Sequence, residues 1–163
     1  MALSKIQRAA AEVFEAAKTR GLTLATAESC TGGLIAAVIT AIPGASAVLE
    51  CGFVTYSNAA KTEMLGVPAE LIECKGAVSQ EVALAMVDGA LKHSRADLAV
   101  AVTGIAGPGG GSEAKPVGLV HIAAARRGGA RLHEEHRFGH VGRNEVQTES
   151  ALAAIALIQK LLD

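Results

Sequence analysis

A polar turn at residues 28–33 lies between a short apolar segment and a helical one, and it sets the local architecture of this chain. Residues 22–27 have the length and apolar character of a strand, and residues 34–39 are typical of a helix. The turn between them contains a carboxylate, two hydroxyls and a thiol. Because a helix N-terminus offers unpaired N–H groups and the positive end of a dipole, such a turn can hold an anion or stabilise an oxyanion beside a nucleophile. The sequence therefore predicts a reactive or anion-binding site at this turn.

The composition bounds the fold and argues against one class of partner. With 163 residues the chain can form one domain with a hydrophobic core. Because it has three Phe, one Tyr and no Trp, that core must consist of Ala, Val, Leu and Ile. Lys and Arg number 15 and Asp and Glu number 16, so no broad basic surface is expected. The near-neutral charge and the scarcity of aromatic residues argue against nucleic-acid binding.

The cysteines and the apolar runs indicate a cytoplasmic chain that does not enter a membrane. Cys30, Cys51 and Cys74 form no CxxC pair, which argues against a disulfide framework or a zinc site and favours reduced thiols. Residues 4–19 are amphipathic and charged, unlike a signal peptide. The longest apolar run, residues 34–42, is far shorter than the ~20 residues that span a bilayer.

Hydrophobic periodicity and turn residues predict that helices and strands alternate. We expect helices at residues 4–19, 32–41, 58–65, 68–74, 79–93 and 143–162. We expect strands at residues 23–27, 48–56 and 97–103, followed by a β-hairpin of residues 117–125 and 131–138 around Gly128 and Gly129. This order predicts an α/β fold, a three-layer α/β/α sandwich whose mixed central sheet ends in a β-hairpin.

The polar turn holds two candidate nucleophiles. Ser29 either caps the helix that follows or acts as a nucleophile with a base beside it. Cys30 has no histidine obviously placed as its partner, which favours a buried structural role. Lys61 follows a predicted strand and turn, so it is either a solvated surface charge or, if it faces Ser29, a desolvated general base. Tyr56, the only tyrosine, either packs in the core or lines a pocket.

The later polar segments give weaker signals. Residues 103–112 form a glycine-rich loop without the spacing of a P-loop or a dinucleotide fingerprint. Backbone contact with a phosphate or planar ring and a plain connection both stay open for this loop. On a strand, His133 and His136 point to opposite faces, which argues against a metal site. Arg143 opens the last helix and is either a surface charge or a phosphate ligand.

Several multi-residue blocks together resemble one known family, the CinA C-terminal domain family. The resemblance covers nearly the whole chain in order and is carried by residues 27–33, residues 52–58 with Lys61, and residues 76–79, 104–112 and 115–118. It implies a single CinA C-terminal-type amidase domain over residues 1–163, without the large N-terminal domain of full-length CinA. It also implies an amidohydrolase that converts the carboxamide of nicotinamide mononucleotide to nicotinate mononucleotide and ammonia, in pyridine nucleotide salvage.

The same resemblance implies the roles of individual residues. Ser29 would be the nucleophile, Lys61 its base and Tyr56 a neighbour in the catalytic group. The small-molecule substrate would be bound by Glu28, Cys30, Thr31, Gly32, Gly33, Thr103, Gly104, Gly107, Gly110 and Arg143. No cofactor and no metal is implied. Relatives often carry a second basic residue at the position of Gln147.

Two further expectations concern self-association and the class of function. We expect the Ala- and Leu-rich first and last helices to be exposed, and this predicts a homo-oligomer. A non-catalytic, pyridine-nucleotide-binding or regulatory module linked to competence and DNA damage also stays open. Such a module would bind the nucleotide without releasing ammonia.

Overall fold

Five strands form one mixed sheet in the computed structural model, which describes residues 3–163; their order is β2-β1-β3-β4-β5. Parallel pairing joins β1 (Leu24–Glu28) to both β2 (Leu49–Val54) and β3 (Leu98–Gly104). Antiparallel pairing joins β3 to β4 (Leu119–Arg126), and β4 to β5 (Arg131–Arg137). The prediction of a mixed sheet that ends in a hairpin is confirmed.

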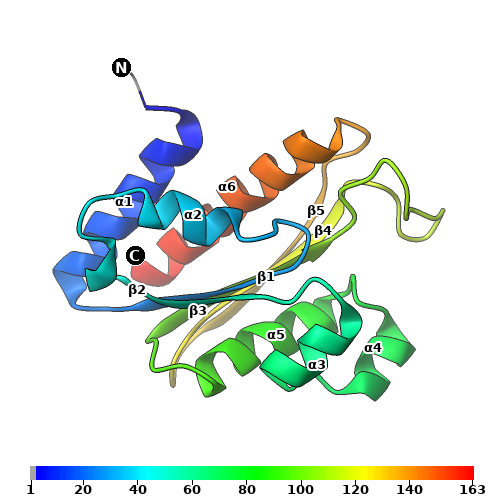
Figure 1. The fold of residues 1–163 in the computed structure, drawn as a ribbon, viewed down its shortest axis with the longest axis horizontal. Coiled ribbons are helices and arrows are strands. Elements are labelled where there is room, and N and C mark those ends of the chain that lie inside the picture. The colour runs from blue at the N-terminus through cyan, green and yellow to red at the C-terminus, as the bar shows by residue number, and fades with distance from the viewer. Residues whose placement is uncertain (1–2) are drawn as a thin grey trace.

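Helices cover both faces of this sheet, as Figure 1 shows. One face carries α1 (Lys5–Arg20), α2 (Leu34–Thr40) and α6 (Arg143–Leu162). The other face carries α3 (Asn58–Leu65), α4 (Ala69–Lys75) and α5 (Gln80–Lys92), and a short 3-10 helix, η1 (Ala45–Ala47), precedes β2. The predicted three-layer α/β/α arrangement is therefore confirmed. Within residues 3–163, no helix combines the length and the apolar character needed to cross a bilayer.

The predicted boundaries lie within two residues of the observed ones, and two of the differences have clear local causes. The sequence predicts a helix from residue 32, but α2 begins at Leu34 because Gly32 and Gly33 adopt φ angles of 60° and 104°. The sequence also predicts a strand as far as residue 56, but β2 ends at Val54. The chain turns there toward Ser57, whose hydroxyl caps α3.

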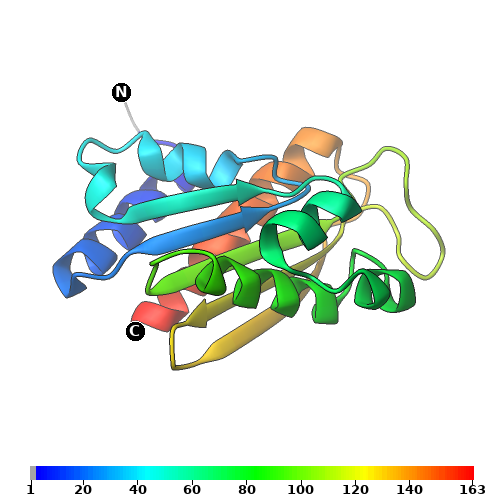
Figure 2. The same ribbon diagram turned by 60° about the horizontal axis from the view of Figure 1, so that its bottom comes forward.

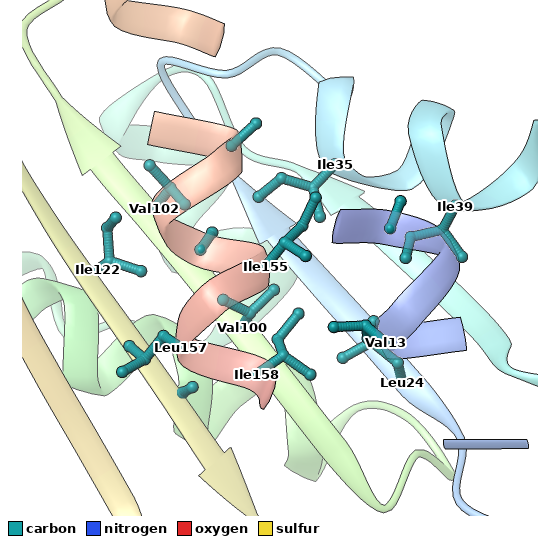
Figure 3. Packing of buried hydrophobic residues seen from close by; sticks show 14 of the residues in the cluster. Val13, Leu24, Ile35, Ile39, Val100, Val102, Ile122, Ile155, Leu157 and Ile158 are labelled. Atoms are coloured by element: carbon teal, nitrogen blue, oxygen red, sulfur yellow. The ribbon is translucent and has the colours of Figure 1, made fainter. Parts of the chain in front are cut away.

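Alternate side chains of β3 enter two separate cores. Leu98, Val100 and Val102 pack with α1, α2 and α6 in the larger cluster, part of which Figure 3 shows from close by. Ala99 and Ala101 point to the opposite face and pack with the helices α3 to α5. Because these alanines are small, α5 can lie close to the sheet.

The apolar faces of α1 and α6 are buried, not exposed. Val13 of α1 and Ile155 and Ile158 of α6 are at most 1% exposed and belong to one cluster. The two helices pack against each other and against the sheet. Their apolar faces therefore give no argument for self-association. That part of the sequence interpretation is wrong, and self-association itself stays a prediction.

The carboxyl ends of β1, β2 and β3 meet at one edge of the sheet. Figure 2 shows the start of α3, the start of α6 and the glycine-rich loop between β3 and β4 around the same edge. Clefts of open α/β sheets form at such edges. Segments that are distant in the sequence thereby meet beside the turn that follows β1.

The helices α3 and α5 approach each other closely at Gly89. A Cβ atom at Gly89 would lie 2.0 Å from the backbone oxygen of Leu65. Replacing glycine by alanine inside a helix ordinarily stabilises it by about 1 kcal/mol. Overpacking costs about 1–3 kcal/mol, so we expect Gly89→Ala to lower the free energy of unfolding, measured by urea denaturation.

Gly129→Ala serves as the control for this prediction. A Cβ atom there would meet the Arg126 side chain at 3.5 Å, which is an ordinary van der Waals contact. We expect this variant to keep the wild-type stability within about 0.5 kcal/mol. A Gly89→Ala variant as stable as the wild type would show that α3 and α5 do not pack this closely.

Candidate active site

Ser29 and Lys61, which lie 32 residues apart in the sequence, are in direct contact. Lys61 Nζ lies 3.0 Å from Ser29 Oγ, within hydrogen-bond distance. Ser29 directly follows β1, and its N–H donates to the carbonyl of Val102 at 3.0 Å, as a further residue of the strand would. Because side chains alternate along a strand, Glu28 points toward the α2 face and Ser29 toward the α3 face, where Lys61 lies.

Lys61 is a buried amine held by neutral partners. Its side chain is 1% exposed, and Nζ donates to the carbonyls of Thr55 at 2.9 Å and Tyr56 at 3.4 Å. In the described part of the chain, no ion pair joins Lys61 to a carboxylate. Burial lowers the pKa of Lys61 from its ordinary value of 10.5, because the charged form loses its hydration. The surface-charge interpretation of Lys61 is therefore wrong.

Cys30 is a buried thiol beside this pair. It is 5% exposed, and burial raises its pKa to about 12. The thiolate, which is the reactive form of cysteine, is thus strongly disfavoured near neutral pH. The predicted structural role of Cys30 agrees with this environment, and Ser29 is the better-placed nucleophile of the turn.

Glu28 is fully buried, and its side chain stabilises the turn and does not line the pocket. Its carboxylate accepts the hydroxyl of Thr31 and the N–H of Ile35, both at 2.8 Å, and the N–H of Ala36 at 3.1 Å. These bonds satisfy donors at the start of α2. The expectation that Glu28 lines a substrate pocket is corrected by this placement, because its side chain lies on the α2 face of the sheet.

A pocket of about 250 Å³ opens beside the Ser29–Lys61 pair. Eight of the predicted residues line it: Ser29, Cys30, Tyr56, Lys61, Thr103, Gly104, Gly110 and Arg143. Glu28, Thr31, Gly32, Gly33 and Gly107 lie outside the lining. They form the turn and the loop beside the pocket, and contact of these residues with the substrate stays a prediction.

Arg143 joins two segments at the rim of this pocket. One of its guanidinium nitrogens donates to the hydroxyl of Tyr56 at 2.6 Å, and the other terminal nitrogen donates to the carbonyl of Gly107 at 2.9 Å. Tyr56 is 57% exposed, so its core-packing interpretation is wrong. The guanidinium group has five N–H donors, so others stay available to an anionic ligand.

Sequence reasoning missed several lining residues. They are Asn58, Ala77, Val78, Ile105, Ala106 and Gly109. Asn58 could have been found, because it precedes Lys61 by three positions and therefore shares its helix face. Ala77 offers only backbone: its carbonyl accepts the hydroxyl of Thr103 at 2.8 Å. Nothing in its side chain points to that contact.

Two other polar regions are also settled by the structure. Gln147 Nε2 donates to the carbonyl of Cys30 at 3.1 Å, so this residue supports the turn from α6. His133 contacts His121 on one face of β5, and His136 contacts Glu134 near α6, which confirms the predicted opposite directions. Over residues 3–163, no three His, Cys, Asp or Glu side chains are grouped as metal ligands.

The fold and the site define an α/β domain with a buried hydroxyl–amine pair at the edge where its parallel strands end. The chain belongs to the CinA C-terminal domain family, whose model matches residues 6–162. The crystal structure of competence/damage inducible protein CihA from Agrobacterium tumefaciens is similar, with a TM-score of 0.97, 50% identity and 100% of each chain covered.

Curated relatives are of two lengths. The nicotinamide-nucleotide amidohydrolase PncC of Escherichia coli is 56% identical over 122 residues, which are 75% of this chain and 74% of that protein. A CinA-like protein of Geobacter sulfurreducens is 49% identical over 157 residues, which are 96% of this chain and 37% of that protein. The chain spans only between 26% and 37% of the length of four such longer relatives.

The burial of Lys61 makes a prediction about stability and pH. Its pKa is lowered in the folded state, so between that lowered value and 10.5 the unfolded chain holds a proton that the folded chain lacks. In that window the wild type should gain stability over Lys61→Met as pH rises, by about 1.4 kcal/mol per pH unit. Urea denaturation of both proteins from pH 7 to pH 10.5 measures this difference. A difference that falls with rising pH would mean that folding raises the pKa.

Proposed function

We propose that this chain hydrolyses the carboxamide of nicotinamide mononucleotide to nicotinate mononucleotide and ammonia. The observation that carries the proposal is the 3.0 Å contact between Lys61 Nζ and Ser29 Oγ at the wall of a pocket. The similarity to a relative named nicotinamide-nucleotide amidohydrolase supports the choice of substrate. We further propose that the reaction takes place in the cytoplasm as part of pyridine nucleotide salvage.

Acylation begins with a proton transfer from Ser29 to Lys61. The neutral amine of Lys61 accepts the hydroxyl proton while Ser29 Oγ attacks the carboxamide carbon, which the cationic pyridinium ring makes more electrophilic. The 3.0 Å separation lies in the range for such a transfer. The C–N bond then breaks, and the protonated Lys61 delivers its proton to the leaving ammonia.

The turn after Ser29 has donors for the oxyanion of this step. In the described part of the chain, the backbone N–H groups of Cys30 and Thr31 make no hydrogen bond to another residue. A well-placed donor of this kind is worth about 3–4 kcal/mol in the transition state. Deacylation reverses the roles: Lys61 takes a proton from water, the hydroxide attacks the ester carbon, and Ser29 Oγ leaves with the proton that Lys61 returns.

The nucleotide portion would lie along the rim. Arg143 is the cation of the lining besides Lys61, and Gly109 and Gly110 bring backbone close to the pocket. A guanidinium group can bind a phosphate through two N–H groups at once. We propose that Arg143 binds the substrate phosphate, while Asn58 and Thr103 face the remainder of the ligand.

Ser29→Ala tests the nucleophile. We expect ammonia release from nicotinamide mononucleotide to fall ~1000-fold or more, because the hydroxyl that attacks the carboxamide is missing. Cys30→Ala is the matched variant in the same turn, and it should keep most of the turnover because the thiol takes no part. A coupled ammonia assay in the presence of a chelator measures both variants.

The same assay separates hydrolysis from the non-catalytic alternative. Tight binding of the nucleotide by the wild-type chain with no ammonia released would contradict hydrolysis and support the regulatory module. Equal ammonia release by Ser29→Ala and the wild type would eliminate Ser29 as the nucleophile. Loss of turnover in Cys30→Ala alone would assign the chemistry to the thiol.

Arg143→Lys tests the phosphate contact. Lysine keeps the charge but loses the planar fork, so we expect KM for the mononucleotide to rise about tenfold or more. For nicotinamide riboside, which lacks the phosphate, kcat/KM should change by less than about threefold. Steady-state kinetics on both substrates measure the two effects. An equal loss on both substrates would place Arg143 elsewhere in the mechanism.

A further inference from the structure

We propose that Glu28 is a positioning residue for the hydrolysis proposed above. Its contact with Thr31 is required for the full rate of the reaction at Ser29. The Glu28 carboxylate would accept hydrogen bonds from the backbone N–H groups at the start of α2. The backbone N–H groups next to Ser29 would then remain available to the oxyanion. The inference rests on the proposed function, because it concerns the rate of that reaction.

The first argument is the cost of burying Glu28. Its side chain is 0% exposed, and no cation pairs with it among the described residues. A buried carboxylate without a counter-ion is expensive unless hydrogen bonds satisfy it. Three donors do so, from Thr31, Ile35 and Ala36. A less costly apolar or amide side chain would suffice if the position only filled space.

The second argument is the division of donors. The carboxylate holds the N–H groups of Ile35 and Ala36, which lie inside the first turn of α2. In contrast, the N–H groups of Cys30 and Thr31 make no hydrogen bond to another residue within residues 3–163. The Thr31 hydroxyl, bound to the same carboxylate at 2.8 Å, fixes the turn between these two sets of donors.

The third argument is that Glu28 supports the base as well as the nucleophile. Its backbone carbonyl accepts the N–H of Thr55 at 2.8 Å, and the carbonyl of Thr55 accepts Lys61 Nζ at 2.9 Å. Thus the side chain of Glu28 fixes the turn that follows Ser29, and its main chain fixes the segment that holds Lys61. A shift of Glu28 changes the geometry on both sides of the catalytic contact.

Asp97 provides the matched control, because its carboxylate also holds backbone at one end of β1 but lies away from the pocket. Its carboxylate accepts the N–H and hydroxyl of Thr23 at 2.9 and 3.2 Å, just before the opposite end of β1. It is half-buried and lies away from the pocket lining. Asp97→Asn therefore weakens an anchor of the same strand without touching the turn.

The experiment compares Thr31→Val with Thr31→Ser, and Glu28→Gln with Asp97→Asn. Thr31→Val keeps the shape but removes the hydroxyl, and we expect kcat to fall on the order of 10- to 100-fold while KM changes by less than about threefold. Thr31→Ser restores the hydroxyl, so its kcat should be about tenfold or more above that of Thr31→Val. Glu28→Gln should lower kcat at least as much as Thr31→Val, because an amide nitrogen cannot accept the N–H that faces it.

Asp97→Asn should lower the melting temperature but leave kcat within about twofold of the wild type. A fall in kcat that follows the loss of melting temperature across all four variants would overturn the proposal in favour of general destabilisation. Equal kcat values for Thr31→Val and Thr31→Ser would also overturn it, because the hydroxyl would then not matter. If Glu28→Gln does not fold, the two Thr31 variants decide alone.

A serine-directed fluorophosphonate separates this inference from the proposed function. Ser29 Oγ displaces fluoride from the phosphorus of the probe and loses its proton to Lys61, so labelling needs no natural substrate. We expect about tenfold or more slower labelling of Thr31→Val than of Thr31→Ser. If the wild type releases no ammonia but Thr31→Ser is labelled faster than Thr31→Val, only the proposed substrate is wrong. If all variants label at the wild-type rate, the positioning role of Glu28 is wrong.

Discussion

The hydrogen bond between a buried amine and the hydroxyl of Ser29 is the interaction on which the rest of the site depends. Carbonyl oxygens accept Lys61 Nζ, and among residues 3–163 no carboxylate pairs with its charged form. Burial therefore moves the amine toward its neutral form. A neutral amine can accept a proton, whereas an amine paired with a carboxylate would stay charged. The proposed role of Lys61 as a base therefore depends on the lack of a carboxylate beside it among the described residues.

The geometry of the site follows from the pleat of β1 and from the layers around the sheet. Because neighbouring residues of a strand point to opposite faces, Glu28 enters the α2 layer and Ser29 the α3 layer. The layer of α3 to α5 can approach closely because Ala99 and Ala101, which β3 presents on that side, are small. One pair of adjacent residues therefore links the Glu28 contacts on one face to the Ser29–Lys61 contact on the other.

Much of the fold could be predicted from the sequence, because local patterns determine it. The alternation in β3, the hairpin and the last helix were all readable from the spacing of apolar residues and glycines. The role of Glu28 in stabilising the turn was missed. It could have been predicted, because neighbouring side chains of a strand point to opposite faces and Glu28 precedes Ser29. The contact of the Tyr56 hydroxyl could not be found locally, because its partner, Arg143, lies 87 residues further on. The burial of Lys61 is likewise a tertiary property that no local pattern records.

The bridge made by Arg143 has a consequence for the way the pocket is built. A single side chain at the first residue of α6 ties the segment after β2 to the loop after β3. The segment after β2 also holds the amine, because the carbonyls of Thr55 and Tyr56 accept Lys61 Nζ. Arg143 therefore couples the first turn of α6 to the segment that holds Lys61 Nζ.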